Sequence, residues 1–184
     1  MLGLHSRRFT KHFFLESTDE SQQEFHLESA LKGYEKTRLY QPRNTRIYLM
    51  ADQVQAQLYD DLLREGTNLF QRQEYSASAT AFELASMVHP EDSVTLQYAA
   101  SISMQGELYE RAVRNYKKLV LLTPKVSLHQ SVIGIQKDRM QNDSLALISI
   151  KEAQEVYPNQ YEFKRYELDI YLKNGNNDKA KILL

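Results

Sequence analysis

Two stretches decide the fold: YSASATAFELASMVHP at residues 75–90 and YERAVRNYKKLVLLTP at residues 109–124. Each begins with tyrosine and ends at a proline, and the two prolines are 34 residues apart. Because proline cannot continue a helix and commonly follows a helix end, prolines at a fixed interval indicate helices that stop at a fixed interval. Pro158 follows after a further 34 residues. The sequence therefore predicts a helix–turn–helix repeat of this length.

Other positions keep the same phase when each repeat is numbered so that its proline is residue 32. Mostly small residues recur at repeat positions 8 and 20, and a larger apolar residue recurs at position 24. Small residues let two helices approach closely, and the larger residue fills the space between neighbouring repeats. Position 8 holds Gly66, Ala100, Gly134 and Leu168; position 20 holds Ser78, Ala112, Ala146 and Ala180; position 24 holds Phe82, Tyr116, Ile150 and Leu184.

This pattern resembles the tetratricopeptide repeat family, in the form found in bacterial arrays. The resemblance covers three full repeats, at residues 59–92, 93–126 and 127–160, and an incomplete repeat at residues 161–184. It implies an all-α fold, a right-handed superhelical solenoid of antiparallel helix pairs. Stacked helix pairs of this kind form a concave face.

The residues before the repeats divide into two segments. Residues 26–58 are expected to form a partial repeat followed by the N-terminal extension of a long helix over residues 45–71. Ile47, Met50, Val54 and Leu58 support this helix because they continue one apolar stripe into the first full repeat. We consider two roles for it, a capping helix that covers the core and a docking helix for a partner. Residues 1–25, polar and serine-rich in their second half, are expected to be irregular or poorly ordered.

Helix boundaries can also be placed from capping residues and turns. Asn44, Ser93, Ser127 and Asn159 stand where N-caps are needed, because each side chain can accept a hydrogen bond from an amide that has no partner inside the helix. The segment NGNND at residues 174–178 predicts the turn between the two helices of the last repeat.

No pattern in the sequence indicates an enzyme. Cysteine is absent, and the five histidines are scattered without a second ligand at helical spacing. Phosphate-binding loops and nucleophile elbows are also absent. We therefore expect no catalytic residues, no metal site and no cofactor.

The net charge and the hydropathy argue against nucleic acid and the membrane interior as partners. The formal net charge is −1, which argues against a nucleic-acid binder, and the basic stretch RNYKK at 114–118 is interpreted as the solvated face of a second helix. No apolar run approaches the ~18 residues of a membrane span, and no signal peptide is visible. Membrane insertion is not expected, and the compartment is left open between cytoplasm and periplasm.

The resemblance implies a non-catalytic protein–protein interaction scaffold that binds a peptide or a helix of another protein in its concave groove. In the family, that face is lined mainly by the first helix of each repeat. Its positions carry over to Leu63, Arg64, Thr67 and Phe70 in the first repeat, Gln97, Tyr98, Ser101 and Gln105 in the second, Ser131, Val132, Ile135 and Arg139 in the third, and Arg165, Tyr166, Asp169 and Lys173 in the fourth.

Two other functions fit the same array: a regulatory or sensory repeat module of a longer protein, and a secretion-type chaperone. The chain stops inside the second helix of the fourth repeat, on Lys-Ile-Leu-Leu at 181–184. Solenoids normally finish with a polar capping helix. We therefore expect a fragment of a longer protein, or an end covered by a partner or by self-association.

Overall fold

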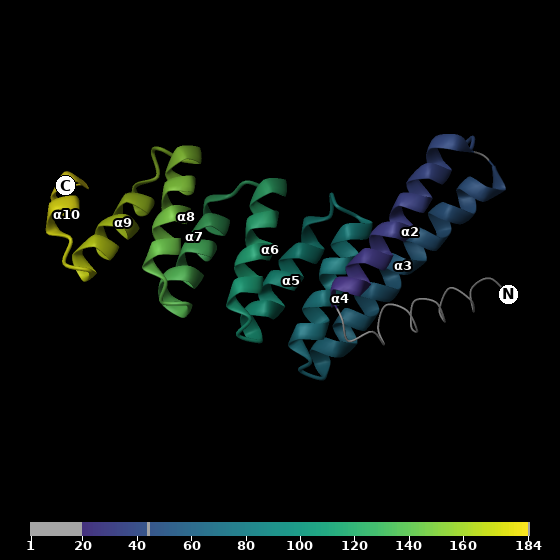
Figure 1. Ribbon diagram of the computed structural model, residues 1–184, viewed down its shortest axis with the longest axis horizontal. Helices are drawn as coiled ribbons and strands as arrows, with labels where there is room; N and C mark the ends of the chain where they lie inside the picture. Colours follow the sequence, from purple (N-terminus) through teal and green to yellow (C-terminus); the bar gives the residue numbers. More distant parts are fainter. Residues whose placement is uncertain (1–19, 44, 184) are drawn as a thin grey trace. The chain divides into compact units, whose positions relative to one another are not determined.

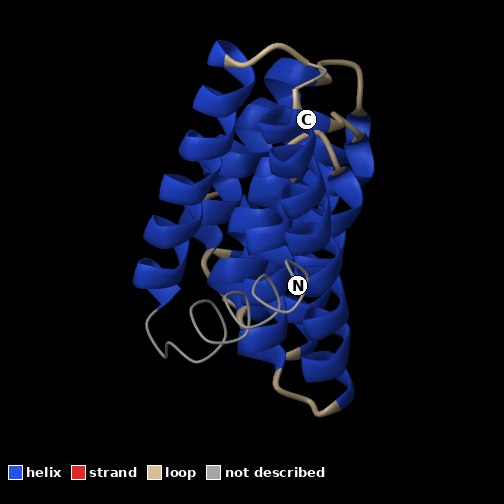
Figure 2. Ribbon diagram, turned by 90° about the vertical axis from the view of Figure 1, so that its right-hand side faces the viewer, coloured by secondary structure: helices blue, strands red, loops and turns tan. Residues whose placement is uncertain are grey.

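A computed structural model describes residues 20–43 and 45–183, and these residues are almost entirely helical (Figure 2). The described residues form nine α-helices and one π-helical turn and contain no strand. The predicted all-α class is confirmed. The chain divides into two compact units, residues 1–106 and 107–184.

The first unit contains α2 (Glu20–Tyr40), α3 (Arg46–Gln71), α4 (Tyr75–Val88) and α5 (Ser93–Gln105). Helix α2 packs against α3 and α4, α3 packs against α4, and α4 packs against α5 (Figure 1). The core therefore lies along α4, which contacts each of the other three helices.

The second unit contains α6 (Tyr109–Leu122), α7 (Val126–Gly134), the π-helical turn η2 (Ile135–Arg139), α8 (Asp143–Val156), α9 (Tyr161–Lys173) and α10 (Asn177–Leu183). Each α-helix of this unit packs against the next one along the chain, and η2 also packs against α6 and α8.

The predicted interval of 34 residues recurs in the helix bounds. The second helices of the predicted repeats begin at residues 75, 109, 143 and 177, and the first helices end at 71, 105, 139 and 173. Each intervening turn contains one residue with positive φ, namely Gln73 (62°), Glu107 (59°), Gln141 (52°) and Gly175 (68°). A left-handed residue just after a helix end lets the chain reverse while its amide groups bond to the last carbonyls of the helix.

The long helix predicted for residues 45–71 is confirmed as α3. Its N-cap is Thr45, whose hydroxyl oxygen accepts a hydrogen bond from the amide of Tyr48 at 3.3 Å. Leu58 is buried on the predicted apolar stripe, whereas Ile47 at the start of the helix is 57% exposed. The stripe therefore contributes to the core only from the second turn onward.

The N-terminal segment differs from the expectation of irregular structure over residues 1–25. Residues 20–25 belong to α2, which continues without a break to Tyr40. Leu27 is fully buried in a cluster with Leu58 and Leu62 of α3, so contact with the long helix holds α2 in place. Residues 1–19 lie outside the described part of the chain.

The N-caps predicted from the sequence are wrong by one or two residues. The caps are Asp92, Lys125 and Gln160, while Asn44 lies outside the described residues. Asp92 accepts a hydrogen bond from the amide of Val94 at 2.8 Å. Two adjacent residues, Asp92 and Ser93, both have capping side chains, and the sequence does not distinguish them. The predicted turn at 174–178 is present, although α10 already begins at Asn177.

The small residues at the repeat positions are buried as predicted in most cases. Ala100, Ala112 and Ala146 are fully buried, and Ser78 donates a hydrogen bond from its buried hydroxyl to the carbonyl oxygen of Gly66 at 2.7 Å. Gly134 is different, because a Cβ atom added there would meet no atom within 4 Å.

Candidate functional site

The predicted binding face in the first unit lies on α3 and α5. Leu63 and Phe70 are half-buried, and the other six predicted residues are exposed: Arg64, Thr67, Gln97, Tyr98, Ser101 and Gln105. The exposed side chains are polar or aromatic, and Thr67 donates its hydroxyl proton to the carbonyl oxygen of Leu63 at 2.8 Å.

An aromatic cluster connects this face to the core. The ring of Tyr98 lies 5.2 Å from that of Phe82 between centroids, and Tyr98 is 53% exposed. Phe82 belongs to a core cluster against which Leu63 and Phe70 pack. The first unit therefore brings Leu63, Phe70 and Tyr98 against one core cluster that contains Phe82.

In the second unit two of the predicted face residues are not on the surface. Val132 on α7 and Ile135 on η2 are only 2% and 4% exposed, so they belong to the core and the prediction is wrong for both. Ser131 is half-buried, and Arg139 is exposed at the end of η2.

The cause is a shift of one residue in α7. Helices α5 and α9 begin three residues after Pro90 and Pro158, whereas α7 begins two residues after Pro124. The π-helical turn then absorbs the extra residue, with the amide of Met140 bonded to the carbonyl oxygen of Ile135 at 2.9 Å. The C-terminal end of η2 thereby returns to the repeat phase.

Counting from the helix start, and not from the proline, assigns other residues of α7 to the predicted face. Gln130, Ser131 and Gly134 then take the places of Gln97, Tyr98 and Ser101, and all three are partly exposed. Counting from the proline did not select Gln130 and Gly134. The signal that the sequence contains is a glutamine four residues after the start of each helix, Gln97 in α5 and Gln130 in α7.

The predicted face residues on α9 form polar contacts. Tyr166 is half-buried, with the Nζ of Lys137 at 5.6 Å and the guanidinium carbon of Arg165 at 5.9 Å from its ring centroid. Lys173 lies 3.3 Å from the carboxylate of Asp143, which ties the end of α9 to the start of α8. Asp169 is exposed.

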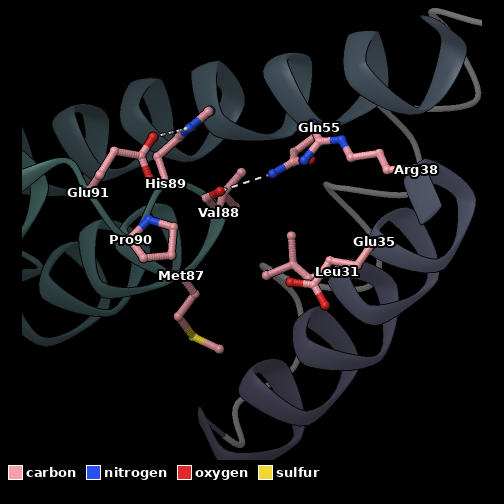
Figure 3. A pocket seen from close by; sticks show the side chains of 9 residues that line it. All are labelled: Leu31, Glu35, Arg38, Gln55, Met87, Val88, His89, Pro90 and Glu91. Carbon is pink, nitrogen blue, oxygen red and sulfur yellow. Dashed lines mark hydrogen bonds and ion pairs between the residues drawn. The ribbon is translucent and has the colours of Figure 1, made fainter. Parts of the chain in front are cut away.

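A cavity of about 360 Å³ is the second candidate site, and it lies in the first unit (Figure 3). Leu31, Glu35 and Arg38 of α2 line one side, Gln55 of α3 lines another, and residues 87–91 at the end of α4 complete it. None of these residues was predicted from the sequence, because they come from three separate segments with no common spacing.

Gln55 forms the inner wall of the cavity, and this residue is 8% exposed. Its Nε2 donates a hydrogen bond to the carbonyl oxygen of Val88 at 3.0 Å, while its buried Oε1 has no hydrogen-bond partner among the described residues. At the rim, Arg38 donates from Nε and Nη2 to one carboxylate oxygen of Asp52 at 2.8 and 2.6 Å.

A second polar cluster, formed by Tyr59, His89 and Glu91, adjoins the cavity, because His89 and Glu91 also line it. Nδ1 of His89 lies 3.2 Å from Oε1 of Glu91, and the His89 ring meets the ring of Tyr59 edge-on at 4.6 Å. A bond to its own backbone amide, and then the contact with His89, lower the pKa of Glu91. Burial, followed by a hydrogen bond donated to Asp92, raises the pKa of Tyr59 to about 12.

His129 of α7 is a buried titratable group in the second unit. Its ring packs edge-on against Tyr157 and Phe163, and Nε2 has no hydrogen-bond partner among the described residues. Burial lowers the pKa of His129, an effect opposed by the charge of Glu152 and increased slightly by Lys117.

Within residues 20–43 and 45–183, no group of three or more His, Asp or Glu side chains is arranged to hold a metal ion. No helix in these ranges combines the length and the apolar character needed to cross a membrane. A search of the sequence against protein-family models and curated proteins finds no match.

Proposed function

We propose that the chain is a tetratricopeptide-type array that binds a segment of another protein and has no catalytic role of its own. The proposal rests on one recurring feature: a left-handed residue lies at 73, 107, 141 and 175, each time in the short turn between two consecutive helices. A turn of one geometry at one interval is typical of a repeat in which every unit reverses the chain in the same way.

In this proposal the helix pairs stack into a right-handed solenoid, and the first helix of each pair faces the concave side. The burial pattern of α5, in the first unit, supports the assignment. On α5, Ala99 and Ala100 are fully buried, while Gln97, Tyr98 and Ser101 are exposed on the opposite side of the helix. A helix with one buried and one exposed side leaves the exposed side free for a partner.

The chemistry of the exposed side suits a peptide. Tyr98 offers a large ring with few rotatable bonds and a hydroxyl that donates or accepts a hydrogen bond. Gln97, Ser101 and Gln105 are exposed on the same helix and add amide and hydroxyl groups that can bond to a peptide backbone. We infer that the partner lies along α3 and α5, with Tyr98 near the middle of the contact.

Site-specific photo-crosslinking tests the proposal. A benzophenone amino acid is placed at position 98 in one version of the full chain and at position 161 in another. Tyr161 is a matched control because it is a tyrosine that is 73% exposed at the start of α9, outside the predicted face. Both versions should keep the wild-type helical circular dichroism.

The proposal predicts a discrete crosslinked protein from position 98 and not from position 161, and its loss when Gln97 and Ser101 are replaced by alanine. The same crosslinked products from both positions would contradict it, as would products that survive the two substitutions unchanged.

A further inference from the structure

We propose that the cavity between α2, α3 and the end of α4 binds an arginine side chain of a partner protein. The site goes beyond the proposed function, because none of its lining residues belongs to the predicted concave face. The cavity can therefore be tested independently of the peptide-binding face.

The cavity carries an excess of negative charge. Four lining side chains can be charged: Glu35, Arg38, His89 and Glu91. The charge of Arg38 is balanced by Asp52, to which it donates two hydrogen bonds. The two carboxylates of Glu35 and Glu91 remain, and Glu91 lies 3.2 Å from Nδ1 of His89. Glu35 has no basic partner among the described residues, so its charge is available to a ligand.

The C-terminal end of α4 adds to the negative electrostatic potential in the cavity. The helix finishes at Val88, inside the cavity wall, and the carbonyl end of a helix carries a partial negative charge. A cation is therefore favoured from two directions, by the carboxylates at the rim and by the helix end at the wall.

A hydrogen-bond acceptor without a donor lies at the inner wall. Gln55 donates one N–H of its side-chain amide to the carbonyl oxygen of Val88, whereas its own carbonyl oxygen has no partner among the described residues. A buried acceptor without a donor is costly, and a ligand that brings a donor within reach removes this cost. The ligand should therefore be rich in N–H groups.

The remaining walls are apolar. Leu31 and Met87 pack against the core cluster that contains Leu27 and Val88, and Pro90 closes the side next to the rim (Figure 3). An arginine fits this combination, because its three methylene groups can lie on apolar walls while its guanidinium presents five N–H donors in one plane. Guanidinium is also less strongly hydrated than the ammonium of lysine, so less is lost when it leaves water.

The test uses the full chain labelled with nitrogen-15 and the peptide acetyl-Gly-Arg-Gly-amide as probe. The matched probe is the same peptide with citrulline, which keeps the shape of arginine and removes its charge. We expect saturable shifts of the Gln55 side-chain amide and of the backbone amides of residues 31–38 and 87–91. The citrulline peptide should bind about 10-fold more weakly.

Two variants locate the charge. Glu35→Gln should weaken binding of the arginine peptide several-fold. Glu24→Gln is the control, because Glu24 is an exposed residue of the same helix and does not line the cavity. It should leave the affinity unchanged. Unchanged circular dichroism in both variants shows that the helices are intact.

Any of three results would show that the cavity does not recognise an arginine side chain: no saturable shift of these amides, equal binding of the citrulline peptide, or equal loss in both variants. n-Propylguanidinium, which carries the guanidinium and methylene chain of arginine without a peptide backbone or a second charge, separates the two sources of this chemistry. If n-propylguanidinium binds as tightly as the peptide, the cavity serves a small molecule, and the assignment to a protein partner is wrong.

Discussion

Phe82 lies so close to Gly66 that a Cβ atom built on residue 66 would come within 2.8 Å of the phenyl ring. Helices α3 and α4 therefore meet where one helix has no side chain and the other presents an aromatic ring. The hydroxyl of Ser78, one turn before Phe82, bonds to the carbonyl oxygen of the same glycine. At this crossing two α4 residues thus contact a single residue of α3.

Gly66→Ala should destabilise the protein by about 1–3 kcal/mol, because the ring of Phe82 has to move to make room for the methyl group. Helix propensity alone predicts the opposite, a gain of about 1 kcal/mol. Urea unfolding followed by circular dichroism decides between them. Gly134→Ala is the control: no neighbour lies within 4 Å of its added Cβ, so propensity should prevail and stability should rise. An equal effect of both substitutions would show that the contact with Phe82 is unimportant.

Gln141→Gly should stabilise the protein by about 0.5–1 kcal/mol. The φ of residue 141 is 52°, a left-handed conformation that is sterically unfavourable for glutamine and not for glycine. We expect the strain removed by glycine to exceed the extra conformational entropy that glycine loses on folding. Thermal unfolding measures the change. Gln97→Gly makes the same replacement inside a regular helix and should destabilise by about 1 kcal/mol. If both variants lose stability, the turn at 141 does not hold a left-handed residue.

Tyr59→Phe should remove a pH-dependent part of the stability at high pH. Because folding raises the pKa of Tyr59 from 10.0 to about 12, its contribution is complete below pH 10 and is lost as the pH rises through 12. Urea unfolding of both proteins from neutral pH upward should show a constant difference of about 1 kcal/mol that shrinks above pH 10. A difference that stays constant up to alkaline unfolding would contradict the hydrogen bond to Asp92.

His129→Gln should make the protein less sensitive to acid. Burial lowers the pKa of His129 below 6.5, so the folded state favours the neutral ring while the unfolded state takes up a proton near 6.5. Its contribution is therefore complete above pH 6.5 and decreases as the pH falls through the folded-state pKa. The groups around the ring are Tyr157, Phe163, Glu152 and Lys117. The urea midpoints at about pH 5.5 and 7.5 should differ less in the variant than in the wild type. If the difference is the same in both proteins, the His129 ring is exposed to solvent and not buried.

The features that could be predicted from the sequence are those set by local chemistry. Helices α4, α6 and α8 each end two residues before a proline, because proline removes a backbone donor and restricts the residue before it. The continuity of α3 also followed from a single apolar stripe. Such features depend on neighbours in the chain, which the sequence contains directly.

The remaining features depend on contacts between distant residues. The register of α7 changes because the loop after Pro124 is one residue shorter, and counting from the proline moved Val132 and Ile135 from the core to the face. The cavity could not be predicted at all. Glu35, Gln55 and Glu91 are brought together only by the packing of α2 on α3 and α4, and their spacing in the sequence has no period.

Hydrogen–deuterium exchange of the full chain, free and bound to the protein captured through position 98, shows which helices the partner covers. We expect slower exchange in α3 and α5, at residues 60–71 and 93–105, with the second helices 75–88 and 143–156 unchanged. Slower exchange confined to the second helices would contradict a binding face on the first helices.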